Sequence, residues 1–137
     1  MKTHKDFKHL ILWQKADAIF HMVCVDARSW SNERIANSIA FQLLDAAGSI
    51  SANIAEGYGR GGPKEFEQFL RYSRGSMAEV ENWLFKAKEQ RLLTVARYEE
   101  YELKFEELRK ISGAFISKLR QQSSNRLSQL LDSSIAR

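Results

Sequence analysis

Hydrophobic side chains recur every three or four residues through most of the chain, which is the period of an amphipathic α-helix. The spacing predicts four helices, over about residues 10–29, 32–56, 63–91 and 95–120. Polar or glycine-rich breaks separate them. Four long helices joined by short connections predict an all-α fold, an antiparallel up-and-down four-helix bundle. The positions expected to face its core are Leu12, Ala16, Ile19, Phe20, Val23, Ala27, Ile35, Ile39, Leu43, Ala46, Ile50, Phe66, Phe69, Leu70, Ser73, Met77, Val80, Leu84, Ala87, Tyr101, Phe105, Leu108, Ser112, Phe115 and Leu119.

The helix ends are predicted from residues that cap or break helices. Ser31 and Asn32 offer side-chain oxygens for the start of the second helix, and Thr94 offers one for the fourth. The glycine-rich segment 57–62 is expected to form the turn after the second helix, with Pro63 as the first residue of the third. We assign structural roles at this turn to Asn53, Glu56, Gly57 and Gly59. Asn53 lies on the core-facing arc and is expected to hydrogen-bond a neighbouring helix or the turn.

The last segment of the chain has a different composition from the rest. Residues 121–137 are rich in serine and glutamine, with a short apolar cluster at Leu127, Leu130 and Leu131. We therefore predict a bundle domain over residues 1–120 and a tail over 121–137 that is frayed or weakly helical.

The second helix is unusually poor in charge. Asp45 is the only charged residue between Ile35 and Ala55, so the face opposite the core stripe is also apolar. A helix that is apolar all round is usually buried all round. We therefore expect a second chain to cover this face, although a monomer with an unusually apolar helix is the alternative. The candidate interface residues are Phe41, Leu44, Gly48, Ala52, Trp83 and Phe85.

Composition narrows the class of protein. The chain has 137 residues, which is the size of one domain, and 44% of them are hydrophobic, enough for a packed core. A single cysteine, Cys24, excludes an internal disulfide framework. No stretch resembles a signal peptide or a membrane span, so we expect a cytoplasmic protein.

Residues with catalytic or cofactor-binding chemistry are present, but their spacing does not support an enzyme. His21 and Cys24 lie three residues apart, yet two ligands on one helix do not make a zinc site. Gly57, Gly59 and Gly62 match a dinucleotide-binding pattern, but that pattern requires a preceding strand, and here a helix precedes it. We expect no catalytic residues, no metal and no cofactor.

The basic residues suggest an acidic partner. The formal net charge is +4, and basic side chains gather near the predicted 57–62 turn and at the amino terminus. Tyr58 adds an aromatic ring that is able to stack on a base. A Lys64–Glu67–Arg71 ladder that neutralises part of this charge is the alternative. The candidate nucleic-acid-binding residues are Lys2, Lys5, Lys8, Tyr58, Arg60, Lys64, Arg71 and Arg74.

Three segments carry a resemblance to a known family. They are residues 6–16 (DFKHLILWQKA), residues 49–60 (SISANIAEGYGR, which matches SIxxNIAEGxGR), and residues 66–81, whose FL and GSMAEVE match FLxxxxGSxxExE. Together they make residues 6–120 similar to the bacterial four-helix-bundle proteins encoded by intervening sequences within 23S ribosomal RNA genes. The tail is outside this resemblance.

The resemblance implies a bundle that assembles as a ring-like homopentamer, with no enzymatic activity. The family includes the accessory variability determinants of diversity-generating retroelements, which bind nucleic acid and a reverse transcriptase. Three functions therefore stay open. They are a nucleic-acid-binding homo-oligomer with largely sequence-independent contacts, a reverse-transcriptase accessory subunit, and a structural oligomer that binds no nucleic acid.

Overall fold

The computed structural model describes residues 5–135, and this part of the chain is all helical. A single 3-10 turn, η1 (Phe7–His9), precedes four α-helices: α1 (Ile11–Ser29), α2 (Arg34–Arg60), α3 (Pro63–Glu89) and α4 (Val95–Ile135). No strand occurs within residues 5–135. The predicted all-α fold with four helices is confirmed.

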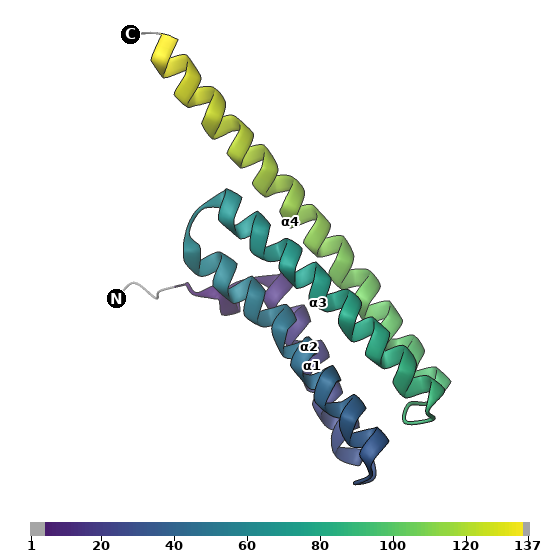
Figure 1. Cartoon of the computed structure of the whole chain (residues 1–137). Coiled ribbons are helices and arrows are strands. Elements are labelled where there is room, and N and C mark those ends of the chain that lie inside the picture. Colours follow the sequence, from purple (N-terminus) through teal and green to yellow (C-terminus); the bar gives the residue numbers. More distant parts are fainter. Residues whose placement is uncertain (1–4, 136–137) are drawn as a thin grey trace.

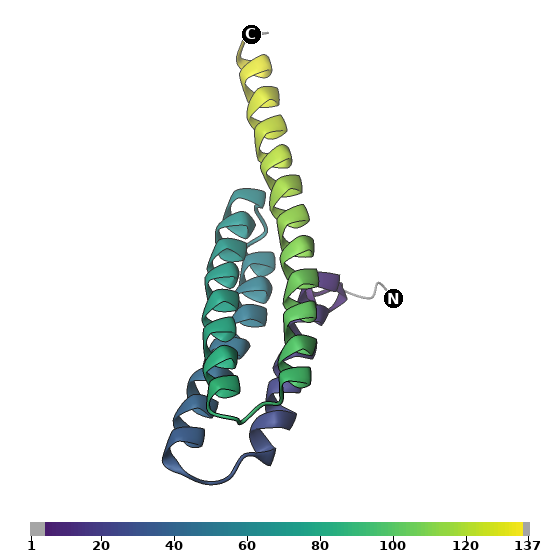
Figure 2. The ribbon, with the colours of Figure 1, turned by 90° about the vertical axis from the view of Figure 1, so that its right-hand side faces the viewer.

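The four helices lie lengthwise against one another (Figure 1). Each helix packs on its neighbours in sequence, and α1 also contacts α4. Figure 2 shows the α1–α2 and α3–α4 connections at one end and the α2–α3 connection at the other. This packing is compatible with a bundle. In both views α4 continues well past the α2–α3 connection.

The core is built from the predicted inward stripes of all four helices. Its largest fully buried side chains include Tyr101, Phe105 and Leu12. Removing a leucine- or phenylalanine-sized side chain from water contributes about 1.5–3 kcal/mol. One inward assignment was wrong, because Ile35 is 53% exposed. Ala36 takes the inward position in the first turn of α2, and one residue of helix turns Ile35 away from it.

The starts of α3 and α4 follow the predicted chemistry, whereas the start of α2 does not. Thr94 Oγ1 accepts from the backbone N–H of Arg97 at 3.0 Å, and Pro63 is the first residue of α3, as predicted. The N-cap of α2 is Glu33, whose carboxylate accepts from the N–H groups of Ile35 and Ala36, instead of Ser31 or Asn32.

The predicted turn at residues 57–62 is shorter than expected. α2 continues through Gly57 and Gly59 to Arg60, and only Gly61 has the left-handed conformation (φ 85°) that ends the helix. Gly57 lies inside α2, at a point where α3 comes very close. A Cβ on this residue would lie 2.6 Å from Cβ of Phe69. The structural assignment of Gly57 to the turn is therefore wrong.

The other residues assigned to that turn also lie inside α2. Asn53 is half-buried and donates from Nδ2 to the carbonyl of Ser49, one turn back in its own helix. No hydrogen bond from it to a neighbouring helix or to the turn occurs in the described part of the chain. Glu56 and Gly59 are exposed.

The end of the fourth helix differs most from the prediction. α4 runs without a break to Ile135 instead of ending near residue 120, so residues 121–135 are helical, the second of the two predicted alternatives. Neither proline nor glycine occurs after Gly113, and glutamine, arginine and leucine favour helix. The prediction followed the buried stripe, which ends at Leu119, while the intrinsic helix propensity continues.

Candidate nucleic-acid interface

The basic residues predicted to bind nucleic acid lie mostly around the α2–α3 connection and along α3. Lys5 precedes η1, Lys8 lies within it, and Lys2 lies outside the described residues. Lys8 Nζ lies 3.4 Å from the carboxylate of Asp6. The backbone N–H of Lys8 donates to the same carboxylate and lowers the pKa of Asp6. Lys8 therefore carries a charge that is partly compensated.

Tyr58 is held by contacts within the chain. Its hydroxyl donates to the carbonyl oxygen of Lys5 at 3.2 Å, and its ring meets the rings of His9 and Phe66 edge-on at 5.6 and 6.1 Å. The residue is half-buried. These contacts fix the amino-terminal segment on α2, and they leave less of the ring available for stacking on a base than the sequence suggested.

Arg60 and Arg71 each pair with a carboxylate one turn earlier in the same helix. Arg60 bonds Glu56 at 3.0 Å, and its guanidinium lies 5.4 Å from the centre of the Phe69 ring. Arg71 lies 3.1 Å from Glu67. Part of the expected ladder on α3 is thus present, and it reduces the charge that these two arginines offer to a ligand.

Lys64 and Arg74 are the basic candidates on α3 that keep their charge free. Both are exposed, and neither forms an ion pair within residues 5–135. Arg74 lies seven residues from both Glu67 and Glu81, which places all three on one face of α3. Glu67 and Glu81 bridge this face to Arg120 and Arg109 of α4.

The carboxy-terminal part of α4 adds arginines that the sequence analysis did not select. Arg120 and Arg126 line a groove of about 700 Å³ together with Pro63, Lys64 and Leu127. Arg126 was missed because it lies in residues 121–137, which were expected to be frayed or weakly helical, and Arg120 because it is the last residue of the predicted helix over 95–120. We call the set the α3–α4 basic face, and its members are Lys64, Arg71, Arg74, Arg109, Arg120 and Arg126.

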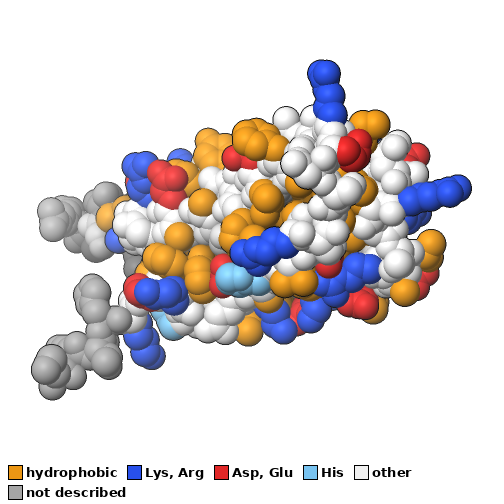
Figure 3. All heavy atoms as spheres, turned by 90° about the horizontal axis from the view of Figure 1, so that it is seen from below, with side chains coloured by type: hydrophobic (Ala, Val, Ile, Leu, Met, Phe, Trp, Pro, Cys, Tyr) orange, Lys and Arg blue, Asp and Glu red, His pale blue; other side chains and the backbone are white. Residues whose placement is uncertain are grey.

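Charge on other parts of the surface is mixed. The end of the molecule seen from below in Figure 3 shows lysine and arginine interspersed with acidic side chains and hydrophobic patches. The six basic side chains of the α3–α4 basic face lie beside three carboxylates, Glu65, Glu67 and Glu81. This face is therefore the best candidate surface for a polyanion.

The candidate oligomer interface is only partly uncovered in the single chain. Phe41 is 69% exposed, and Ala52 is also exposed on the same side of α2. Leu44 is half-buried against the core, and a Cβ on Gly48 would contact Phe20 of α1 at 3.7 Å.

The two candidates on α3 differ in the same way. Trp83 is half-buried and packs against the core. Phe85 is 45% exposed and meets Tyr98 edge-on at 6.3 Å, with the ammonium of Lys88 5.0 Å from its ring centre. Phe41, Ala52 and Phe85 are thus the candidates that present surface to a second chain.

No group of three or more histidine, cysteine, aspartate or glutamate side chains able to hold a metal ion occurs among the described residues. His21 pairs with Asp17 at 3.3 Å on the exposed side of α1. None of the helices in the described part of the chain combines the length and apolar character needed to cross a membrane.

Four packed helices with a mixed-charge surface define a small all-α protein. The family model of the 23S rRNA-intervening sequence protein matches residues 8–114. The chain belongs to this family. The match ends within α4, so the last part of that helix, with Arg120 and Arg126, lies beyond it. A comparison with curated proteins gave no match.

Proposed function

We propose that this protein is a non-enzymatic homo-oligomer that binds RNA or DNA through phosphate contacts with little sequence preference. The α3–α4 basic face carries the proposal. Its exposed charges, Lys64 and Arg74 above all, come from long helices and reach outward, and Lys64 lines an open groove with Arg120 and Arg126. Such side chains contact phosphates, which position a nucleic acid but do not read its sequence.

Assembly would multiply this face. A protomer of net charge +4 is only mildly basic, and Arg60 and Arg71 each share their charge with a carboxylate in the same helix. A ring of antiparallel bundles repeats each basic face, and several weak sites on one particle bind a long polyanion far more tightly than one site does. Nucleic-acid binding and assembly are therefore proposed together.

The binding experiment is a salt titration with mixed-sequence RNA and duplex DNA. We expect the affinity of the wild type to fall as salt rises, because binding releases counterions from the phosphates. The variant Lys64→Glu with Arg74→Glu should bind more weakly. Its salt slope should be shallower by about 0.7–0.9 for each phosphate that the variant no longer neutralises.

A control variant tests whether the loss of affinity comes from this face or only from the lower net charge. Lys104→Glu with Lys118→Glu makes the same change in net charge at two exposed lysines of α4. They lie on the side of α4 where Glu107 pairs with Lys15 of α1. It should bind nearly as the wild type does. If both variants lose the same affinity, the face is not the site. If the wild type does not bind at low salt, the third function, a structural oligomer, is favoured.

The assembly is tested at Phe41. Phe41→Arg places a charge at a residue that is 69% exposed in the single chain, so the protomer should fold normally while the interface is disrupted. An unpaired charge buried between two chains costs several kcal/mol. Light scattering should show an oligomer, in our proposal a pentamer, for the wild type and a smaller species for the variant.

Val95→Arg is the matched control, because Val95 is 64% exposed at the start of α4, outside the candidate interface. It should keep the wild-type mass. A wild type that is monomeric in solution, or a Phe41→Arg variant of unchanged mass, would contradict the proposed interface.

A further inference from the structure

The part of α4 beyond the bundle carries an uncovered apolar stripe. Leu127, Leu130 and Leu131 are 59%, 63% and 56% exposed, although Leu130 continues the inward side of the helix that buries Leu119, with Leu127 and Leu131 next to it. Figures 1 and 2 both show why: the other three helices end near the α2–α3 connection, and α4 continues alone. The α2–α3 connection and the start of α3, from Gly62 to Glu67, line a groove with Leu127 and Leu130 and leave Leu131 outside it.

The charges beside the stripe indicate what kind of surface would cover it. Between Gln121 and Ser134 the only charged residues are Arg126 and Asp132, which have opposite signs. The segment is therefore neutral, unlike the basic body of the protein. A polyanion or an acidic membrane surface needs several basic side chains, and residues 121–134 supply one, Arg126, at the edge of the α3–α4 basic face.

A second copy of the same segment fits this surface. Two neutral helices do not repel each other, and leucines packed on leucines remove apolar area from water on both chains. Arg126 and Asp132 lie on either side of Gln129, each three residues away. An antiparallel pair centred there brings opposite charges to the same level along the two helices, whereas a parallel pair brings like charges together.

We propose that the carboxy-terminal part of α4 is a self-association site that joins two copies of this chain in antiparallel orientation through Leu127, Leu130 and Leu131. This interface is distinct from the proposed ring interface at Phe41 and lies beyond the residues that the family model matches. Three leucines form a small patch, so the contact is weak and concentration-dependent. Where copies are already held together, paired contacts reinforce one another.

The experiment is sedimentation of the full-length chain over a hundredfold range of concentration. We expect the mass of the wild-type particle to double across the range. The variant Leu127→Gln, Leu130→Gln, Leu131→Gln should stay at the lower mass, since glutamine keeps helix propensity while removing the apolar stripe. Leu103→Gln is the matched control, because Leu103 is 68% exposed on the bundle part of the same helix. It should double as the wild type does.

A cross-linking readout gives the same information without relying on mass. In a Cys24→Ser background, Leu130→Cys should form an intermolecular disulfide under mild oxidation, and Leu103→Cys should not. A wild-type mass that is constant over the range overturns the proposal in favour of a different protein as the partner. Equal doubling of the triple variant overturns it as well.

The same measurement distinguishes a failure of this proposal from a failure of the proposed ring. If the ring interface fails and the stripe holds, the wild type passes from monomer to dimer. If the ring holds and the stripe fails, its mass is that of the ring at every concentration. In Phe41→Arg the doubling should persist on the smaller particle.

Discussion

Gly57→Ala is expected to lower the free energy of unfolding by about 1–3 kcal/mol, the range typical of overpacked cores. A Cβ at this position would lie 2.6 Å from Cβ of Phe69 and 3.0 Å from Cδ1 of Phe66. Cβ of Phe69 is bonded directly to the α3 backbone, so it cannot rotate away, and α2 and α3 must move apart. Alanine gains about 0.5–1 kcal/mol over glycine in a helix, which does not offset that movement.

Gly59→Ala, in the same helix, is expected to stabilise the protein instead. Nothing lies within 4 Å of the Cβ it would add. The substitution should therefore raise the free energy of unfolding by up to about 1 kcal/mol through helix propensity alone. Urea unfolding at one fixed protein concentration measures both variants, since assembly would make stability depend on concentration. If Gly57→Ala stabilises the protein as much as Gly59→Ala does, the close contact of α2 with α3 at Gly57 is wrong.

The pattern of hydrophobic residues predicted the core, because the buried side of a helix repeats in the sequence with the period of the helix. An inward stripe such as Leu70, Met77 and Leu84 is recognisable without knowing its neighbours. The conformation of Gly57 and Gly59 was not recognisable in this way. Glycine is compatible with both a turn and a helix, and only the packing of Phe66 and Phe69 against Gly57 decides between them.

The candidate site was predictable in outline only. Residue type and spacing gathered Lys64, Arg71 and Arg74 on α3, but whether a charge is free depends on partners from other turns and helices. Glu67 accepts from Arg71 in its own helix and contacts Arg120 of α4, a pairing that depends on how α3 packs against α4. A helix that leaves its bundle keeps no buried stripe to mark it, so Arg126 was missed.

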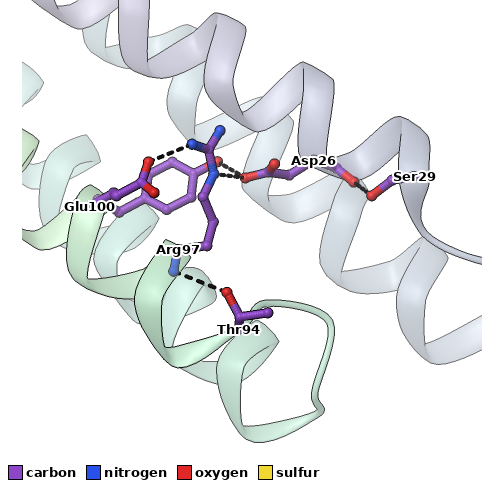
Figure 4. A network of polar contacts seen from close by, with 6 residues as sticks. Asp26, Ser29, Thr94, Arg97 and Glu100 are labelled. Atoms are coloured by element: carbon purple, nitrogen blue, oxygen red, sulfur yellow. Dashed lines mark hydrogen bonds and ion pairs between the residues drawn. The ribbon is translucent and has the colours of Figure 1, made fainter.

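Asp26 holds a polar network between α1 and α4 that the sequence analysis did not identify (Figure 4). Its Oδ2 accepts from the hydroxyl of Tyr101 at 2.5 Å and from Nε of Arg97 at 2.9 Å. Arg97 also donates to Glu100 at 2.7 Å. Tyr101 is 1% exposed, so its hydroxyl reaches into the space between the helices and depends on this acceptor.

The same surroundings set the ionisation of Tyr101. Burial raises the pKa of its hydroxyl above the ordinary value of 10.0, and the hydrogen bond to Asp26 and the charge of that carboxylate raise it further. The unfolded chain therefore ionises at Tyr101 before the folded chain does. The stability that this group contributes is present below about pH 10 and is lost as the pH rises towards the raised pKa.

Asp26→Ala should lower the free energy of unfolding by about 2–3 kcal/mol, because a buried hydroxyl and a charged guanidinium lose their shared acceptor. Asp26→Asn keeps one acceptor oxygen and should lose less. Asp17→Ala is the matched control: Asp17 lies in the same helix, and its pair with His21, which is 70% exposed, should contribute about 0.5 kcal/mol or less. In urea unfolding at pH 7 the three variants should rank in that order. Equal stabilities for Asp26→Ala and Asp17→Ala would show that the network does not hold α1 against α4.

Tyr101→Phe should flatten the loss of stability above pH 10, whereas Tyr72→Phe, at a residue 51% exposed, should leave it unchanged.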